Sequence, residues 1–554
     1  MGSIFSAEQL KSLHQEAAAE SLISIRPGEP ANPTSLTLRR TRRPFWNTHA
    51  RRFIYSPSFN FETVEGAEKY RFSVTSSIGS KDYIFEADIP WASLSPVWNE
   101  LPVGEATLKV EAIDAKGLVT GQSELADPPC RYQDFDKSGS ESSPLSGYPK
   151  LRRFYRAAVF RGGYSDVSTG YRQSAVKALK YLYNEKHYQN WATNGEPDPN
   201  YTLYCYPSKT VAAVVDSMVM YSKVDAVDSA RALFIAEGAA NYLIRISLPA
   251  GSPFEYLPPT YQGIKHTAGK YAGQIMMICP PSVGETYLNL YEATKKDKYL
   301  QAARRIADTY VKLQLSSGTW PLKVDTKTGK PITDNLCVPT PMLDLFDRLA
   351  DTYGLKQYDK PCKSALQWIM ANPVATYNWE GQFEDVEPSS PYQNLSGNQA
   401  CSVVLYLLDH CQDNPQYLPI ALELLRFVED QFVIWEKPFP TRDKDAMGEK
   451  AHSKDWVTPC VLEQYGYYVP IDFSAAGMIA ACSKAYQVTG KKLYLAKACE
   501  LADAVIVAQD AKTGLYRTYW WKKDGPWEEG YWLNCAAYDI KVMLEFAQII
   551  DKNK

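Results

Sequence analysis

The stretch "KKDKYLQAARRIADTYVKLQL", residues 295–315, shows the pattern that decides the fold of most of this chain. Its apolar residues recur at the i, i+3, i+4, i+7 spacing of an amphipathic α-helix, which predicts a helix from Asp297. A second stretch, "GKKLYLAKACE" at 490–500, enters a helix in a similar way. Two such similar helix starts, far apart in the sequence, indicate a repeated helical unit.

The same periodicity predicts twelve helices after Phe160, joined alternately by a few residues and by roughly fifteen to forty. This alternation predicts six helical hairpins that close into a ring, with inner helices packed against outer ones. The predicted fold is therefore mainly α, an (α/α)6 toroid over residues 161–554. The expected helix starts are Gln173, Ser208, Asp228, Pro281, Asp297, Thr340, Gln357, Asn398, Gln416, Phe473, Lys491 and Asn534.

Residues 40–125 have a different pattern. "EKYRFSV", "DYIFEADI" and "ATLKVEAIDA" are short alternating stretches separated by Gly, Ser and Pro, which is typical of a small β-sandwich of the fibronectin III or immunoglobulin kind. The Pro-, Ser- and Gly-rich residues 126–160 are predicted to be a linker. Residues 1–39 are predicted to form an N-terminal helix and an extended segment.

Composition and charge limit the classes of function. The net charge of −3 argues against a nucleic-acid partner, and no run of eighteen apolar residues predicts a membrane span. The eleven cysteines include no C-x-x-C spacing, so we expect no metal site and no cofactor. The first residues contain no apolar core of leader length, which predicts a cytoplasmic location, or a secreted one if a leader has been removed.

The long connections differ from the short ones in chemistry. Every one contains Tyr or Trp and at least one charged residue, and "WEGQFEDVEPSSPYQNLSGNQA" at 379–400 holds four carboxylates, three aromatic rings and five side-chain amides. Aromatic rings suit the apolar faces of sugars, so we expect these loops to line a sugar-binding cleft. The simpler alternative is that the rings pack the loops onto the helices and the carboxylates are only solvated.

Glycoside hydrolysis needs two carboxyl groups that flank the scissile bond. The candidates are Glu255, Glu380, Glu384, Asp385, Glu463 and Asp472. Glu463 in "CVLEQYGYY" has apolar and aromatic neighbours, which raise the pKa of a carboxyl toward that of a general acid. We therefore predict a catalytic pair of Glu463 with either Glu384 or Asp385.

Two other functions stay open. One is β-elimination from a uronic acid with Tyr261 or His266 as the base, and the other is glycan binding without chemistry. For each of them, and for hydrolysis, we predict the same substrate-binding residues: Tyr256, Tyr271, Lys209, Trp379, Glu380, Tyr392, Asn394, Gln464, Tyr465 and Trp532.

Four stretches, together with six predicted hairpins behind a β-rich segment, resemble the six-hairpin glycosidases. They are "FIYSPSFNFETVEGAEKYRFSV", "SPFEYLPPTYQG", "NWEGQFEDV" and "TPCVLEQYGYYVPID". That superfamily includes glycoside hydrolases and polysaccharide lyases, many of which act on uronic-acid sugars, and within it the chain is similar to the β-glucuronidases of glycoside hydrolase family 154. The resemblance implies an exo-acting hydrolase of glucuronic-acid oligosaccharides. It assigns no catalytic residue.

Other toroids of paired helices fit the sequence less well. Isoprenoid cyclases need Asp-rich metal clusters, and neither D-D-x-x-D nor D-x-D-D occurs here. The expected partner is an oligosaccharide. The β-sandwich could complete the cleft or form a homodimer contact.

Overall fold

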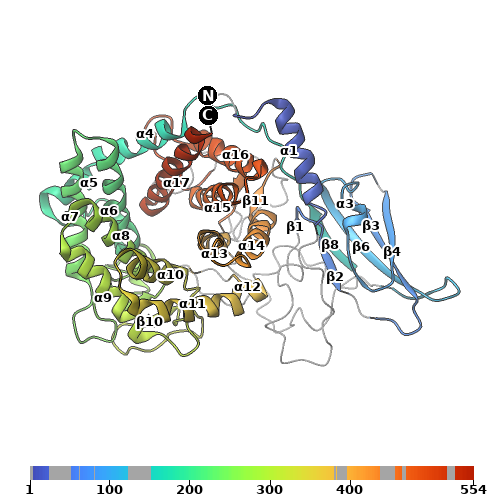
Figure 1. The fold of residues 1–554 in the computed structure, drawn as a ribbon, viewed down its shortest axis with the longest axis horizontal. Helices are drawn as coiled ribbons and strands as arrows, with labels where there is room; N and C mark the ends of the chain where they lie inside the picture. The colour runs from blue at the N-terminus through green and yellow to red at the C-terminus, as the bar shows by residue number, and fades with distance from the viewer. Residues whose placement is uncertain are drawn as a thin grey trace.

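The structure is a computed structural model that describes residues 4–23, 52–60, 63–79, 81–122, 151–379, 382, 396–436, 456–463, 470–520 and 531–553. Figure 1 shows a ring of helices beside a sheet, with helix α1 (Ala7–Glu20) between them. Helix α1 begins with a capping box, in which the Ser6 amide donates to Gln9 Oε1 at 2.7 Å and the Gln9 amide donates to Ser6 Oγ at 3.2 Å. The expected N-terminal helix is present.

Six helices form the inner ring, each packed against the next and the last against the first. In ring order they are α6 (Pro207–Val224), α8 (Cys279–Thr294), α10 (Thr340–Asp347), α13 (Gly397–Asp409), α15 (Asp472–Thr489) and α17 (Leu533–Lys552). Proline stands in the first turn of α6, α8 and α10, where its missing N–H is not needed and its fixed φ favours the helix. The sequence therefore marks the starts of three inner helices directly.

Six further helices surround this ring. They are α4 (Tyr171–Asn184), α7 (Ser229–Ile246), α9 (Asp297–Leu313), α11 (Asp359–Ala371), α14 (Tyr417–Phe432) and α16 (Lys492–Ala508). Each of the last five follows its inner partner after a short connection, whereas α4 pairs with α17 from the far end of the chain and closes the ring. The predicted (α/α)6 toroid is present, and each predicted helix start lies within two residues of the observed one.

Shorter elements occur between these helices. They are α5 (Lys186–Asn194), α12 (Pro373–Thr376), the 3-10 turns η3 (Thr202–Cys205), η4 (His266–Gly269) and η6 (Lys356–Tyr358), and the π-helical turn η5 (Arg348–Thr352) that continues α10. Two small ladders tie long loops together: β9 (Gln274–Met276) with β10 (Lys323–Asp325), and β11 (Val433–Ile434) with β12 (Cys460–Val461).

A six-stranded sheet lies beside the toroid. Its order is β1-β8-β6-β3-β4, with β7 also paired to β6, and only the β1–β8 pair is parallel. The strands are β1 (Arg52–Phe53), β3 (Lys69–Ser76), β4 (Asp82–Ala87), β6 (Gly104–Ile113), β7 (Val119–Gln122) and β8 (Leu151–Arg156). In β3, every second side chain is buried, so the sheet has one apolar face.

The second sheet of the predicted β-sandwich is not confirmed. Among the described residues, the strands outside the main sheet in this region are β2 (Ser58–Asn60) and β5 (Trp91–Ser93), which pair only with each other. The short helix α3 (Ser95–Trp98) packs against the sheet, where Trp98 stacks on Phe154 with ring centroids 6.0 Å apart. Alternation along strands predicts one buried face but cannot tell whether a sheet, a helix or another domain covers it.

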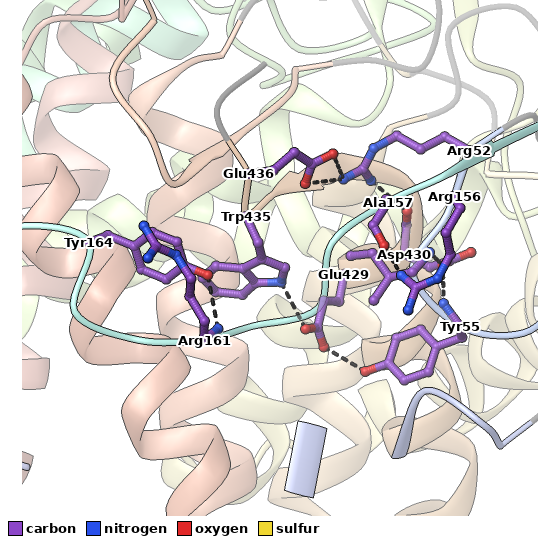
Figure 2. Close-up of polar contacts among 11 residues, drawn as sticks. Arg52, Tyr55, Arg156, Ala157, Arg161, Tyr164, Glu429, Asp430, Trp435 and Glu436 are labelled. Atoms are coloured by element: carbon purple, nitrogen blue, oxygen red, sulfur yellow. Dashed lines mark hydrogen bonds and ion pairs between the residues drawn. The ribbon is translucent and has the colours of Figure 1, made fainter. Parts of the chain in front are cut away.

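Strand β8 extends the sheet into the segment predicted to be linker, because Phe154 faces the core and its backbone pairs with β6 and β1. The sheet meets the toroid through a buried polar junction at the end of α14 (Figure 2). There Asp430 Oδ1 accepts the amides of Ile54 at 2.5 Å and Tyr55 at 2.9 Å. The sheet is thus fixed to the toroid by directional hydrogen bonds as well as by apolar packing.

Candidate functional site

The inner helices all begin at the same end of the toroid. Each follows a long connection, and each except α17 is followed by a short turn into its outer partner, so the long loops gather where the inner helices start. Long loops on a rigid scaffold are the usual location of binding and catalytic residues. This end of the toroid is therefore the expected location of a functional site.

Two aspartates lie buried between neighbouring inner helices there. Asp472 is the first residue of α15 and Asp539 lies in the second turn of α17, and both are 0% exposed. Asp472 Oδ1 accepts the Phe473 amide at 2.7 Å. Asp472 Oδ2 and both oxygens of Asp539 have no hydrogen-bond partner among the residues that the structure describes. Two buried carboxyls so poor in donors cannot both hold a negative charge.

The pKa values of these aspartates reflect that environment. Burial raises the pKa of Asp472 to about 8, with a further upward contribution from Glu463. Burial raises the pKa of Asp539 well above its ordinary value, and the neighbouring Asp472 raises it further. Burial and the closeness of the two groups therefore both favour the protonated forms of these carboxyls.

Three other groups surround the pair. Burial raises the pKa of the Cys535 thiol, and Asp472, Asp539 and Glu463 raise it further while Lys209 lowers it. One thiol therefore lies within electrostatic reach of three carboxyl groups and one ammonium group. Lys209 stands in the first turn of α6, and Glu463 follows β12 in the loop before α15, so three neighbouring inner helices contribute.

The loops before α15 and α17 are tied together beside these residues. The Asp472 amide donates to the Thr518 carbonyl at 3.1 Å, and the Trp532 amide donates to Thr518 Oγ1 at 2.9 Å. Thr518 therefore holds the starts of both helices. Trp532 is half-buried at the start of α17.

A cluster of aromatic rings continues from Trp532. Tyr206, directly before α6, lies 5.2 Å from Trp532, 6.2 Å from Tyr261 and 6.4 Å from His266 between ring centroids. Tyr261 in turn lies 5.3 Å from Tyr271. The Lys209 amide donates to the Tyr206 carbonyl at 3.0 Å, so the aromatic cluster adjoins the charged cluster.

Cations also accompany these rings. Lys323 Nζ lies 4.5 Å and Lys270 Nζ 4.8 Å from the centre of the Tyr271 ring. His266 is exposed, and its Nε2 is 2.8 Å from Thr202 Oγ1. The arrangement combines rings, ammonium groups and carboxyl groups within one group of loops.

Further buried polar atoms at the loop end have no hydrogen-bond partner within the described part of the chain. They include Gln399 Oε1 in the first turn of α13, Asn534 Oδ1 in the first turn of α17, and Trp456 Nε1. Buried polar groups are normally satisfied, so these atoms have hydrogen-bonding capacity for a ligand.

The structure brings together five of the predicted site residues and separates others from them. Lys209, Glu463, Tyr261, Tyr271 and Trp532 lie in or beside the two clusters, with His266 at the rim. The roles of these six residues stay predictions. The predictions for Glu380, Glu384, Asp385, Tyr392, Asn394, Gln464 and Tyr465 lie outside the described residues.

Two aromatic residues that were predicted to bind the sugar lie outside these two clusters. Trp379 is 0% exposed, so neither face of its ring is open to a sugar, and it packs its loop down as part of the core. Tyr256 lies on the outer side of the toroid, where the Arg305 guanidinium of α9 is 5.1 Å from its ring. Glu255 beside it pairs with Lys312 of α9 at 3.2 Å, which removes this carboxylate from the candidate pair.

Tyr206 and Asp539 were not among the predicted site residues. Tyr206 was one tyrosine among many in its loop. Asp539 in "NCAAYDIKVML" is an acidic residue within an otherwise largely apolar helix, and acidic residues are mostly exposed. Its position as the single acidic residue of this run is the feature of the sequence that could have identified Asp539 as a candidate.

Two other kinds of feature, a metal site and a membrane-spanning helix, are absent from the described residues. No group of three or more His, Cys, Asp or Glu able to hold a metal ion occurs among the described residues. Of the helices in the described ranges, none combines the length and apolarity needed to cross a membrane.

Comparison with known proteins shows likeness in shape without likeness in sequence. No family model matches the chain, and no curated protein matches it in sequence. A family 76 glycoside hydrolase from a bovine Bacteroides thetaiotaomicron strain is 10% identical with a TM-score of 0.44, covering 87% of this chain and 93% of that one.

Two other solved structures are similar at the same level. A D-mannose isomerase is 12% identical with a TM-score of 0.48, covering 68% of this chain and 97% of that one. An unsaturated glucuronyl hydrolase specific for heparin is 9% identical with a TM-score of 0.43, covering 69% and 98%. Likeness of this degree assigns neither a reaction nor a substrate.

Proposed function

We propose that this protein is a carbohydrate-active enzyme that cleaves glycosidic bonds in oligosaccharides containing glucuronic acid. The observation that supports this most is the pair of polar atoms without partners among the described residues at the starts of α13 and α17, Gln399 Oε1 and Asn534 Oδ1, close to the aromatic cluster of Trp532 and Tyr206. A sugar offers many hydroxyl donors and acceptors together with apolar C–H faces, and it could satisfy both features at once.

The preference for an acidic sugar rests on charge. Lys209 acts electrostatically on the Cys535 thiol, which also lies close to the buried pair, and Lys270 Nζ is 4.8 Å from the centre of the Tyr271 ring. A carboxylate on the sugar would gain charge-assisted hydrogen bonds from such ammonium groups. The narrower likeness to the β-glucuronidases of glycoside hydrolase family 154 is part of this proposal.

In the proposed reaction Glu463 protonates the leaving oxygen, and Glu384 or Asp385 activates water or attacks the anomeric carbon. Glu463 is half-buried, beside two carboxyls that are held uncharged. An acid close to groups that do not repel its charge can ionise and reprotonate within each turnover. β-Elimination with Tyr261 or His266 is the alternative, favoured by the closeness of both rings to Tyr206.

A single assay distinguishes these reactions. The protein is incubated with oligosaccharides of glucuronic and galacturonic acid while reducing ends and ultraviolet absorbance are recorded. New reducing ends without absorbance indicate hydrolysis, and reducing ends with the absorbance of a conjugated C4–C5 double bond indicate elimination. If neither signal appears on acidic or neutral sugars but sugar binding persists, the chain is a binding protein.

Two substitutions test the role of Glu463. Glu463→Gln removes the transferable proton, and we expect kcat to fall by on the order of 10²–10⁴-fold. Glu255→Gln makes the same chemical change at the outer ion pair with Lys312 and should leave kcat within about twofold. Near-normal activity of E463Q would remove Glu463 from the mechanism.

A further inference from the structure

The interface between α15 and α17 contains two buried aspartates that the proposed reaction does not use. Asp472 and Asp539 are fully buried, and three of their four carboxyl oxygens have no hydrogen-bond partner among the described residues. An ionised carboxylate in such surroundings loses its hydration without compensation, and two ionised carboxylates would also repel each other. This arrangement persists only if protons neutralise it.

We propose that Asp472 and Asp539 form a pair of hydrogen-bonded carboxylic acids, both protonated and therefore uncharged at neutral pH, and that this lets the site accept an anionic sugar near Lys209. The inference rests on the proposed function, because it concerns the charge of that function's substrate. Both residues are positioning residues, since neither is exposed to a bound sugar.

The geometry explains why two aspartates are needed rather than one. An acid pair satisfies one carboxyl with the proton of the other, so the group can stay buried without further donors. The main-chain amide of Phe473 supplies one donor to Asp472 Oδ1 at 2.7 Å. The pKa of Asp472 of about 8 then sets the pH at which the first negative charge arises on the pair.

The charge of the pair acts within a defined set of neighbours. Lys209 comes from α6, Glu463 from the loop before α15, and Cys535 from the turn of α17 that precedes Asp539. Two tyrosines also face Asp539, and its charge contributes to raising the pKa of each. They are Tyr516, in the loop after α16, and Tyr538 of α17.

Lys209 is the cation of this set, and ionisation of the pair would partly cancel its attraction for a sugar carboxylate. One added negative charge among these neighbours is expected to weaken binding of an anion on the order of tenfold. A neutral sugar should be almost unaffected. The prediction is therefore a loss of uronic-acid binding between about pH 7 and pH 9.

The first test measures protonation and does not depend on function. Infrared spectra recorded from pH 6 to pH 10 report the carbonyl stretch of protonated carboxylic acids. We expect a band at pH 7 that decreases near pH 8, and this decrease should be smaller in the isosteric variant D472N/D539N than in the unmodified protein, since other buried carboxyls such as Asp344 also contribute to the band. The control is Asp503→Asn on the outer helix α16, where burial raises the pKa of Asp503 to about 7 and Tyr171 donates at 2.9 Å.

The second test measures binding of D-glucuronate and D-glucose by calorimetry at pH 7 and pH 9. In the unmodified protein and in D503N, we expect glucuronate binding to weaken on the order of tenfold at pH 9, with glucose binding unchanged. In D472N/D539N, glucuronate binding should no longer change with pH. If that variant does not fold, the pH dependence of the unmodified protein still decides.

The outcomes are distinguishable. An equal decrease of the infrared band in D472N/D539N and in the unmodified protein overturns the acid pair, whatever the protein does. A smaller decrease in the variant combined with pH-independent glucuronate binding overturns the effect of the pair on substrate charge. A smaller decrease in the variant with no binding of either sugar overturns both that effect and the proposed function, while leaving the protonation itself established.

Discussion

At the scale of single residues, burial decides which of the acidic side chains can take part in chemistry. Asp472 and Asp539 lie in the protein interior, whereas Glu255 forms an ion pair on the outer surface. The residue type alone, Asp or Glu, does not distinguish the environments of these three side chains. The sequence identified Asp472 as a candidate but could not rank it, because its environment is made by α17, which lies over sixty residues further along the chain.

The aromatic residues illustrate the same limit. A ring in a long loop was expected to face a ligand, and Tyr261, Tyr271 and Trp532 do lie in one cluster. Trp379, at 0% exposed, is fully buried, and Tyr261 and Tyr271 are also largely buried at 5% and 2%, because burying a large apolar surface stabilises the fold whether or not the residue belongs to a loop. Composition alone does not separate these two uses of a ring.

Asp510 gives a prediction at this scale. Its carboxylate accepts the amides of Lys512 at 3.0 Å and Thr513 at 2.8 Å, and it pairs with Arg517 at 2.9 Å. The Thr513 amide is the main cause that lowers the pKa of Asp510 to about 2. A lowered pKa stabilises the fold above the unfolded value near 4, and the contribution is lost as pH falls from about 4 to about 2.

Asp510→Asn should therefore lower the free energy of unfolding by about 1–2 kcal/mol at pH 7. The difference from the unmodified protein should shrink below pH 4, as measured by urea unfolding at pH 7 and pH 3. Asp413→Asn, at an exposed position in the turn between α13 and α14, is the control and should cost less than about 0.5 kcal/mol. An equal effect of D510N at both pH values would contradict the assignment.

At the scale of elements, the helices follow from local sequence and their close contacts do not. The start of α9 at Asp297 agrees with the prediction, because apolar periodicity and the first-turn acid act within the helix itself. The strand β8 was missed, since its pairing partners lie in other parts of the chain. Sequence patterns therefore predict elements that depend on neighbouring residues, such as α9, better than strands whose partners are distant in the chain, such as β8.

Gly238 of α7 shows how closely two elements approach. A Cβ at this position would lie 2.4 Å from the carbonyl oxygen of Trp191 in α5, an atom of the main chain that cannot move without its helix. Gly238→Ala should therefore destabilise the protein by about 1–3 kcal/mol or more through overpacking. Thermal unfolding measures this.

The matched control is Gly170→Ala at the N-cap of α4. A Cβ there would meet nothing within 4 Å, and φ is −72°. We expect a cost of only a few tenths of a kcal/mol or slightly more, because alanine is a weaker N-cap. Equal effects of G238A and G170A would show that helix propensity, rather than the contact with Trp191, dominates.

At the scale of the whole molecule, a buried ion pair lies close to the junction between sheet and toroid. Glu429 of α14 accepts from Lys497 Nζ of α16 at 2.7 Å. It also accepts from Tyr55 at 2.7 Å, while Trp435 donates to its other oxygen at 3.0 Å (Figure 2). Both charged side chains are nearly inaccessible. The pair therefore connects two outer helices with the chain that leads into the sheet.

Glu429→Gln would leave the Lys497 ammonium buried without a counter-charge. We expect a loss of about 3–5 kcal/mol in the free energy of unfolding, measured by chemical denaturation. The double variant E429Q/K497M removes the buried charge as well and should recover part of the loss. At the surface pair of Lys356 and Asp351, 2.9 Å apart, Asp351→Asn should cost at most about 1 kcal/mol. If E429Q costs no more than D351N, the junction does not depend on this ion pair.

The hydrophobic periodicity and the alternating connection lengths were sufficient to predict twelve helices, their pairing and the toroid. These features arise within helices or between neighbours in sequence, so the chain records them locally. The covering of the sheet, the Asp472–Asp539 pair and the burial of Trp379 depended on contacts between distant segments. Burial and proximity are properties of the folded whole, and they convert ordinary residue types into a site.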